Sequence, residues 1–307
     1  MLVLSVSGGK DSTAMYLLAL ERGLDFRAVF ADTGHEHELT YEYLLELPRH
    51  TGGPVVECVR ADLSGKFAER REAVRRKWPA KGVSPAVIAR AVKALQPSGN
   101  PFLDMCLLRA GFPGNRYRFC TETLKVKPVR EQFYEPLLDV GARITAWHGV
   151  RRDESAMRMN YAATATERWG RGKYEVTIER PILDWTVGDV WAMHAKHGIK
   201  PNPLYAAGAS RVGCAPCIYA RNAEVAMWAE KFPERIERLR EWEEIVNQAG
   251  TGSDESTFFP ARRVRVPGPI HYKTHGIDAK VAAVTADTED LPLEGGCSMP
   301  GLCEGVA

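Results

Sequence analysis

Long apolar runs are absent from this chain of 307 residues. No segment reaches the roughly eighteen consecutive apolar residues that a membrane-spanning helix needs. The N-terminal sequence MLVLSVSGG is apolar, but it lacks the basic flank and the cleavage site of a secretory signal peptide. We therefore expect no association with a membrane and a cytoplasmic location.

A strong net charge is also missing. The formal charge is +2 at pH 7, so no global field attracts nucleic acid. The charge is nevertheless uneven, because residues 66–81 and 116–130 are basic and the tail from residue 278 is acidic. Our first interpretation of residues 66–81 is a solvated helix face. The second basic stretch needs more explanation, since a cysteine lies inside it.

The chain lacks the even cysteine count of a disulfide framework. Seven cysteines in a protein expected to be cytoplasmic instead favour metal binding or redox chemistry. A hydrophobic content of 45% with 26% charged residues is ordinary for a globular protein with a buried core. The cysteines are Cys58, Cys106, Cys120, Cys214, Cys217, Cys297 and Cys303.

Short apolar strands alternate with helices at the start of the chain. Residues 2–6, 26–31 and 54–60 predict strands, and residues 12–23 predict a helix that ends at a glycine. This alternation predicts an α/β fold with a doubly wound parallel sheet. Ligands in such sheets bind beyond the carboxyl ends of the strands.

The remaining segments are read more coarsely. Residues 64–100 predict a helical insertion in which Ser84 caps a helix. A strand is expected after residue 142, a helix capped by Thr186 follows, and residues 234–250 predict an amphipathic helix. We therefore expect a nucleotide-binding domain over residues 1–220. Residues 221–307 are expected to form a helical segment followed by an irregular, cysteine-containing tail.

The loop SGGKDS, residues 7–12, joins the first strand to the first helix. Gly8 and Gly9 allow backbone N–H groups to approach a phosphate, and Lys10 adds a positive charge. The N-terminus of the helix that follows favours anions. A plain glycine turn does not explain why all these residue types occur together. The other expected contributors are the hydroxyls of Ser7 and Ser12 and the carboxylate of Asp11, as a ligand or orienter of Mg²⁺.

This loop differs from the Walker A pattern. It resembles the PP-loop of N-type ATP pyrophosphatases, and five further segments resemble the phosphoadenosine-phosphosulfate (PAPS) reductase family in the family's order. They span most of residues 2–220: ADTGHEHELTYEYL at 31–44, RFCTETLKVKPV at 118–129, HGVRRDESAMR at 148–158, PILDWTVGDVW at 181–191 and NPLYAAGASRVGCAPC at 202–217. The resemblance implies a Rossmann-like fold of the adenine nucleotide alpha hydrolase type. The superfamily includes sulfonucleotide reductases, the small subunit of ATP sulfurylase and the PP-loop protein of DNA phosphorothioation.

The resemblance also implies site residues. Asp32, Thr33 and Gly34 are expected beside the adenosine, and Gly149 and Arg151 near phosphate or sulfate oxygens, which a planar guanidinium binds well. Asp153 and Glu154 are expected to orient the arginines, although Arg152 and Asp153 could instead form a surface ion pair. Four histidines at helix-like spacings are interpreted as solvated or capping residues rather than metal ligands: His35, His37, His194 and His197.

Three cysteines match segments that carry a [4Fe–4S] cluster in some sulfonucleotide reductases. They are Cys120 and the pair Cys214 and Cys217. Phe119 stands where those enzymes have a second, adjacent cysteine. Our preferred fourth ligand is Cys297, with Cys106 and Cys303 as alternatives. A cluster with an open iron and a structural zinc site are the competing interpretations.

The sequence also predicts the properties of three individual cysteines. The basic neighbours of Cys120 are expected to lower its pKa, and Cys58 is expected to be a buried structural thiol in a strand. Cys303 resembles in its position the nucleophile that PAPS reductases carry on a mobile tail. The flanking motif of those enzymes is not reproduced.

The intact phosphate loop decides the preferred function. Sulfonucleotide reductases do not cleave ATP, and their loops depart from this pattern. We expect ATP-dependent adenylation of an anionic or nucleic-acid acceptor, with pyrophosphate release and sulfur transfer from a donor protein. Lys10 is expected to stabilise the leaving group and Arg151 the α-phosphate. The alternatives are reduction of PAPS or APS to sulfite with thioredoxin, and a non-catalytic nucleotide-binding subunit. A homo-oligomer is expected.

Overall fold

A computed structural model describes residues 1–114, 117–252, 255–259 and 271–286 of the chain. Cys297 and Cys303 lie outside these residues, so the roles predicted for them stay predictions. Within the described ranges, none of the helices combines the length and the apolar character needed to cross a membrane.

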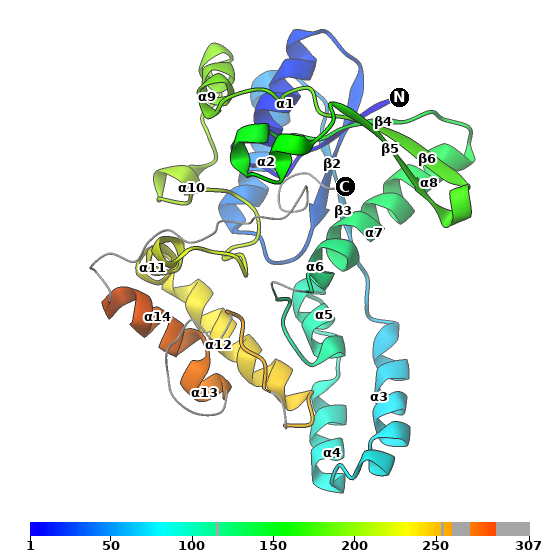
Figure 1. The fold of residues 1–307 in the computed structure, drawn as a ribbon, viewed down its shortest axis with the longest axis vertical. Helices are drawn as coiled ribbons and strands as arrows, with labels where there is room; N and C mark the ends of the chain where they lie inside the picture. Colours follow the sequence, from blue (N-terminus) through cyan, green and yellow to red (C-terminus); the bar gives the residue numbers. More distant parts are fainter. Residues whose placement is uncertain (115–116, 253–254, 260–270, 287–307) are drawn as a thin grey trace.

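Six strands form one sheet in the order β3-β2-β1-β4-β6-β5 (Figure 1). Neighbouring strands are parallel except β5 and β6, which form an antiparallel hairpin at one edge. The predicted α/β fold with a doubly wound, mostly parallel sheet is therefore confirmed. The strands are β1 (Leu2–Ser5), β2 (Phe26–Asp32), β3 (Val56–Arg60), β4 (Thr145–Trp147), β5 (Thr164–Trp169) and β6 (Tyr174–Glu179).

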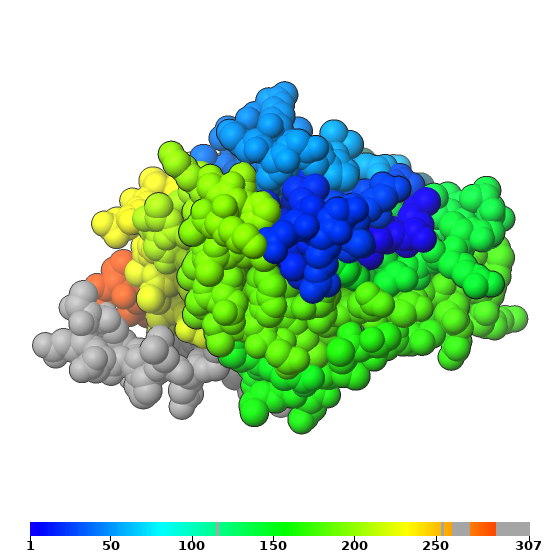
Figure 2. All heavy atoms as spheres, turned by 90° about the horizontal axis from the view of Figure 1, so that it is seen from above, coloured from blue at the N-terminus to red at the C-terminus, as the bar shows by residue number. Residues whose placement is uncertain are grey.

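The centre of the sheet is buried on both faces. Val3 and Leu4 of β1 point to opposite faces, and each is completely buried in a separate hydrophobic cluster. This is why β1 is a short, uninterrupted apolar run rather than an alternating one. On one face, α1 (Lys10–Glu21) packs beside α9 (Val187–Lys196), and Figure 2 shows these blue and yellow-green segments in contact.

A bent helical segment covers the other face of the sheet. Val129 and Phe133 from this segment pack in the cluster that contains Val3. The segment alternates between α-helical and π-helical turns, a form that is rare in proteins and often found at functional sites. Its parts are α6 (Phe119–Thr121), η2 (Glu122–Val126), α7 (Lys127–Val129), η3 (Arg130–Tyr134) and α8 (Glu135–Asp139).

Most of the other helices lie below the sheet in the view of Figure 1, and the largest hydrophobic cluster forms among them. Phe67, Phe102 and Trp242 are three of its buried members, from the insertion, the helix after it and the C-terminal region. Some helices match the predictions: Ser84 and Thr186 cap α4 and α9. These helices are α2 (Glu38–Thr51), α3 (Lys66–Lys77), α4 (Pro85–Ala94), α5 (Pro101–Arg109), α10 (Pro203–Ala206), α11 (Asn222–Lys231), α12 (Pro233–Gln248), α13 (Tyr272–His275) and α14 (Ile277–Ala286), with α2 lying beside the sheet.

Two features differ from the sequence predictions. The hairpin of β5 and β6 was not predicted, because β5 alternates between half-buried and exposed residues, β6 buries only Val176 and Ile178, and neither strand has an apolar run. The segment after Gly250 was predicted to be irregular, but its described part contains α13 and α14. Glu243 holds these elements in place, since its buried carboxylate accepts hydrogen bonds from the backbone of Phe258 (2.7 Å) and Ile277 (2.9 Å).

Candidate functional site

The phosphate loop lies where the order of the sheet reverses. β2 and β3 follow β1 in the sequence and lie on one side of it in the sheet, whereas β4 comes later in the sequence and lies on the other side of β1. Crevices at such reversal points, beyond the carboxyl ends of the strands, are the usual ligand sites of open α/β sheets. The loop at residues 7–12 follows β1, and the loop that contains Arg151 follows β4.

Hydroxyl groups hold the loop in its shape. The backbone N–H of Ser7 donates to Oγ of Ser12 at 3.1 Å, and this hydroxyl donates to the carbonyl of Gly9 at 3.0 Å. Gly8 has a φ of +75°, a conformation that favours glycine. The two serines therefore fix the backbone that presents Lys10 and the start of α1.

Three residues near position 200 form hydrogen bonds with the backbone of the phosphate loop. Tyr205 accepts a hydrogen bond at its hydroxyl from the backbone N–H of Lys10 at 2.9 Å. His194 donates from Nε2 to the carbonyl of Lys10 at 2.9 Å, and Asn202 donates to the carbonyl of Gly8 at 3.4 Å. Sequence reasoning missed all three roles, and the NPLY motif was the signal that could have indicated two of them. His194 is buried, which lowers its pKa, and it is not the solvated residue that was expected.

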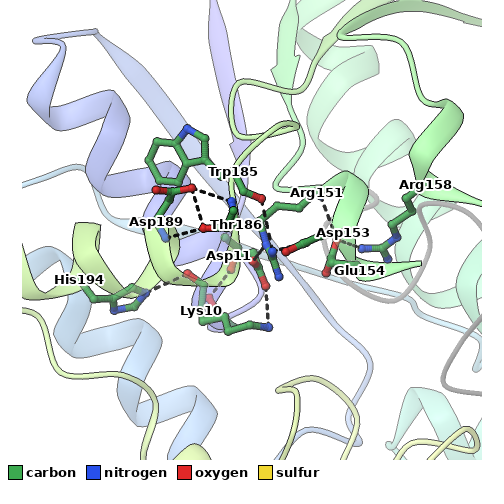
Figure 3. Close-up of polar contacts among 12 residues, drawn as sticks. Lys10, Asp11, Arg151, Asp153, Glu154, Arg158, Trp185, Thr186, Asp189 and His194 are labelled. Atoms are coloured by element: carbon green, nitrogen blue, oxygen red, sulfur yellow. Dashed lines mark hydrogen bonds and ion pairs between the residues drawn. The ribbon is translucent and has the colours of Figure 1, made fainter. Parts of the chain in front are cut away.

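Asp11 is completely buried between two cations (Figure 3). Its Oδ1 accepts from Nε of Arg151 at 2.5 Å, and its Oδ2 lies 2.9 Å from Nζ of Lys10. Burial opposes ionisation of this carboxyl, but the charges of Lys10 and Arg151 outweigh it and hold the pKa of Asp11 below its ordinary value. Each carboxylate oxygen thus has one cationic neighbour, but Oδ2 is buried and accepts no hydrogen bond from the described residues. Asp11 positions the two cations, and its predicted role as a ligand or orienter of Mg²⁺ stays a prediction.

Gly149 allows Arg151 to reach Asp11. A Cβ on Gly149 would lie 3.3 Å from backbone atoms of Asp11 and Ser12, so a larger residue would force the loop after β4 away from α1. Arg151 also pairs with Asp153, and its backbone N–H donates to Glu154 at 2.9 Å. These contacts confirm that Asp153 and Glu154 orient Arg151.

The alternative ion pair between Arg152 and Asp153 is not formed. Nε of Arg152 donates instead to Asp184 at 2.6 Å, and its Nη1 donates to the carbonyl of Met159. Arg152 therefore lies outside the network around Asp11, and its ion pair is a partly exposed one on the surface.

Asp32, Thr33 and Gly34 form a tight turn at the end of β2. Asp32 accepts from the backbone of Gly34 and from the hydroxyl of Tyr41, each at 2.7 Å. Gly34 has a φ of +73°, and a Cβ there would lie 2.7 Å from Pro101. Thr33 donates from its hydroxyl to Glu36 at 2.8 Å. Glu36, which the sequence analysis did not single out, is fully buried, and burial raises its pKa.

Three of the predicted cysteines line one cavity of about 40 Å³ beside this turn. They are Cys120, Cys214 and Cys217, and Sγ of Cys214 lies 3.7 Å from the hydroxyl of Thr33. Val212 also lines the cavity, and its carbonyl lies 3.6 Å from the position of a Cβ on Gly9. The cavity therefore adjoins the phosphate loop. Three cationic side chains complete its lining: Arg118, Lys125 and Arg211.

The thiol groups are less acidic than expected. Burial, together with the charge of Cys217, raises the pKa of Cys120 to about 11, although the ammonium of Lys125 acts in the opposite direction. Burial likewise raises the pKa of Cys214. The prediction of a lowered pKa for Cys120 is wrong, because the loss of hydration exceeds the effect of its basic neighbours. The free thiol is the favoured form in this pocket.

No group of three or more His, Cys, Asp or Glu side chains is arranged to hold a metal ion in the part of the chain that the structure describes. The three thiols share a cavity without forming such a group. Cys106, one alternative fourth ligand, is completely buried in α5, and the charge of Cys120 contributes to its raised pKa. Cys58 lies in β3 as predicted but is exposed, so its expected burial is wrong.

The remaining histidines have structural roles. His35 is 1% exposed and packs against Phe102 and Trp242, with centroids 4.6 and 5.0 Å away. Its Nε2 donates to the carbonyl of Pro216 at 3.0 Å, and burial lowers its pKa to about 3. It is therefore a core residue rather than a solvated one. His37 caps α2, as expected, by accepting from the backbone of Leu39.

Comparison with known proteins identifies the family. The sequence profile of the phosphoadenosine phosphosulfate reductase domain matches residues 1–94 and 104–220. The chain belongs to this family. Among its relatives, an uncharacterized 37.8 kDa protein of Escherichia phage 186 is 42% identical over 268 residues, which cover 84% of this chain and 79% of that protein.

Other members of the PAPS reductase family are more distant. An uncharacterized protein of Methanocaldococcus jannaschii is 28% identical over 82% of this chain, which spans about half (49%) of that protein. The adenosine 5'-phosphosulfate reductase of Streptomyces coelicolor is 36% identical over 115 residues, which cover 36% of this chain and 44% of that enzyme. The crystal structure of PAPS reductase from Candida auris has a TM-score of 0.42 and 14% identity, covering 69% of this chain and 80% of that one.

Proposed function

We propose that this member of the PAPS reductase family binds an adenine nucleotide and carries out sulfur chemistry in the thiol cavity. The observation that supports this most directly is the position of Val212, which lines the cavity and lies against Gly9 of the phosphate loop. A nucleotide with its phosphates on residues 7–12 and its adenosine near the turn at residues 32–34 has its reactive end beside the thiols.

Lys10 and Arg151 are the residues that we assign to the phosphates. They come from the loops after β1 and β4, and Asp11 holds both of them at the same point. An anion bound there meets positive charge from two sides and the N-terminus of α1. The two cations are already in position before the ligand arrives, which lowers the cost of ordering the site.

The preferred reaction is ATP-dependent sulfur transfer, and the complete SGGKDS loop supports it. An acceptor oxygen attacks the α-phosphorus of ATP, and the bond from this phosphorus to pyrophosphate breaks. A sulfur nucleophile supplied by a donor protein then displaces AMP and replaces the oxygen. Lys10 and the loop amides stabilise the charge that develops on the departing pyrophosphate. The acceptor is an anionic molecule, because Arg118, Lys125 and Arg211 line the cavity.

Reduction of a sulfonucleotide is the second candidate. Asp11 already pairs with Lys10 and Arg151, and this reaction does not require Mg²⁺. A relative that matches over 115 residues is named as an adenosine 5'-phosphosulfate reductase. In this reaction a cysteine attacks the sulfur of the sulfonucleotide, the nucleotide leaves, and an external thiol releases sulfite. Cys303 stays our predicted nucleophile for it.

Neither proposed metal group enters these steps. Mg²⁺ at Asp11 stays a proposal, and the thiols among the described residues do not form a metal site. A [4Fe–4S] cluster or a zinc ion on Cys120, Cys214, Cys217 and Cys297 stays a proposal. Anaerobic purification followed by iron, sulfide and zinc analysis tests it. Iron and sulfide that are retained by the wild type and lost in Cys217→Ser support a cluster.

One comparative assay separates the functions. The protein is incubated with ATP, APS or PAPS, and pyrophosphate and sulfite are measured, with Lys10→Ala as the control for background activity. Pyrophosphate from ATP supports sulfur transfer, whereas sulfite from APS or PAPS supports reduction. Tight ATP binding without either product indicates a nucleotide-binding subunit that needs a partner. Absence of nucleotide binding contradicts the proposal.

A further inference from the structure

The helical insertion concentrates the positive charge of the molecule. Residues 66–94, which we call the basic arm, comprise α3, the short turn at Pro79–Lys81 and α4. The arm has nine Lys and Arg against two Asp and Glu, whereas the rest of the chain has 32 against 37. In Figure 1 the two cyan helices extend to the end of the molecule opposite the sheet.

None of the nine cations of the basic arm forms an ion pair within the described ranges. Many arginines elsewhere are paired, for example Arg27 with Glu57 and Arg240 with Asp278. Glu69 and Glu72 lie in α3 among these cations, yet they form no ion pair with them. The exposed cations are Lys66, Arg75, Arg76, Lys77, Lys81, Arg90 and Lys93.

Local helix stability does not explain this pattern. Basic residues in the last turn of α3 interact favourably with the helix dipole, which accounts for Arg75 to Lys77. Lys66, however, is the first residue of the same helix, where the dipole disfavours a positive charge. Arg71 and Arg75 are four residues apart, so their like charges repel. Helix stability therefore accounts for the charge at the end of α3 but not for Lys66 or for the spacing of Arg71 and Arg75.

We propose that the basic arm binds the phosphodiester backbone of a nucleic acid. Several unpaired cations spread over two neighbouring helices match a polymer with regularly spaced phosphates, and they exceed what a single small anion needs. The charge lies apart from the thiol cavity, so it serves the docking of a large partner rather than the chemistry. This inference goes beyond the proposed function and does not depend on which nucleotide the protein uses.

A different occupant is conceivable for part of the arm. A groove of about 710 Å³ between α3 and α4 has half-buried apolar residues, among them Ile88 and Val92, and its rim includes Arg75 and Lys93. An acidic amphipathic helix of a partner protein would fit that groove. It would leave Lys66, Arg76, Lys77 and Lys81 without a role, because they do not line the groove. The nucleic acid accounts for all of them.

The test is the binding of a fluorescein-labelled DNA duplex, followed by anisotropy at several salt concentrations. For the wild type we expect a dissociation constant of about 1–100 µM near physiological salt, and tighter binding at low salt. In the variant R75Q/R76Q/K77Q we expect binding at least ten-fold weaker, with the slope of log K against log salt reduced by about 2 to 3, because each phosphate contact contributes about 0.9.

The control variant R49Q/R168Q/K173Q removes the same charge from exposed, paired cations elsewhere. It should bind the duplex nearly as well as the wild type, as should Ile88→Ala in the groove. Circular dichroism and nucleotide binding must be unchanged in both triple variants. No duplex binding by the wild type, or equal losses in the two triple variants, overturns the proposal. The proposal is also overturned if the wild type binds a synthetic acidic amphipathic peptide but not DNA, and if Ile88→Ala abolishes the binding of that peptide.

Discussion

Arg151 and Asp11 are 140 positions apart in the sequence, yet Nε of Arg151 lies 2.5 Å from Oδ1 of Asp11. The two side chains are 4% and 0% exposed. This contact joins the loop after β1 to the loop after β4, across the point where the order of the sheet reverses. The phosphate site is therefore formed by residues from two segments that are distant in the sequence.

Replacing Arg151 by Met should destabilise the protein strongly. Asp11 would stay buried with Lys10 as its remaining cationic partner, and breaking a buried pair on one side costs about 3–5 kcal/mol. The free energy of unfolding, measured in urea, should fall by about this amount. The double variant with Asp11→Asn should cost less than the sum of the two single variants. Full additivity would show that the pair is not coupled.

Replacing Gly149 by Ala should weaken nucleotide binding more than ten-fold. The new Cβ meets backbone atoms of Asp11 and Ser12 at 3.3 Å, which cannot move aside as a flexible side chain can. Arg151 is then displaced from Asp11. Isothermal titration with ATP and APS measures the effect. Gly65→Ala is the matched control, because no atom lies within 4 Å of a Cβ at that position. Unchanged affinity in Gly149→Ala would contradict this account of the site.

The carboxyl of Glu243 should make stability depend on pH. Burial raises its pKa to about 7, above the ordinary value of 4.5. A group whose pKa is raised by folding stabilises the folded state fully below about pH 4.5, and this contribution is lost as the pH rises through 7. The free energy of unfolding of the wild type, relative to Glu243→Gln, should fall by up to about 3 kcal/mol between pH 5 and 8. A pH-independent difference would refute the raised pKa.

The rate at which each cysteine is alkylated should depend on its exposure to solvent and not on whether it lies in a family motif. At pH 7 iodoacetamide should label Cys58, which is exposed, faster than Cys120 and Cys214, which are half-buried. Burial raises the pKa of all three thiols, so the expected difference comes from access of the reagent. Peptide mapping by mass spectrometry resolves the individual sites. Labelling of Cys120 should accelerate toward pH 11. Rapid labelling of Cys120 at pH 7 would indicate a thiolate and restore the interpretation based on its basic neighbours.

The parallel part of the fold was predictable because its strands are buried on both faces. Such strands appear in the sequence as short apolar runs, and β1 is one of them. The hairpin at the edge of the sheet was not predictable. Its strand Thr164–Trp169 alternates between exposed and half-buried residues and therefore has no apolar run. The two described helices after residue 270 follow a Gly- and Pro-rich stretch that suggested irregular structure. Local composition misled the prediction there.

The parts of the site that lie within a sequence motif were predictable. The parts that depend on contacts between distant residues were not. The loop at residues 7–12 was found from its own residue types. Tyr205 and His194, which hold that loop, lie 195 and 184 positions from Lys10. The NPLY motif draws attention to Tyr205, but the sequence does not show that either residue contacts the loop. The contact between Asp11 and Arg151 was missed for the same reason, because Arg151 becomes a neighbour of Asp11 only in the folded sheet. The raised pKa of Cys120 likewise depends on burial that the sequence does not show.

The position of β1 has a consequence for how the protein is made. β1 lies in the centre of the sheet and is synthesised well before β4, which pairs with one of its two edges at residues 145–147. At a synthesis rate of about 5–20 residues per second, β4 follows β1 about 7–30 s later. During this interval the nascent chain exposes an apolar, half-paired strand, and the phosphate loop has neither Arg151 nor Tyr205 to hold it. Nucleotide binding can therefore begin only after the chain has been synthesised beyond Tyr205.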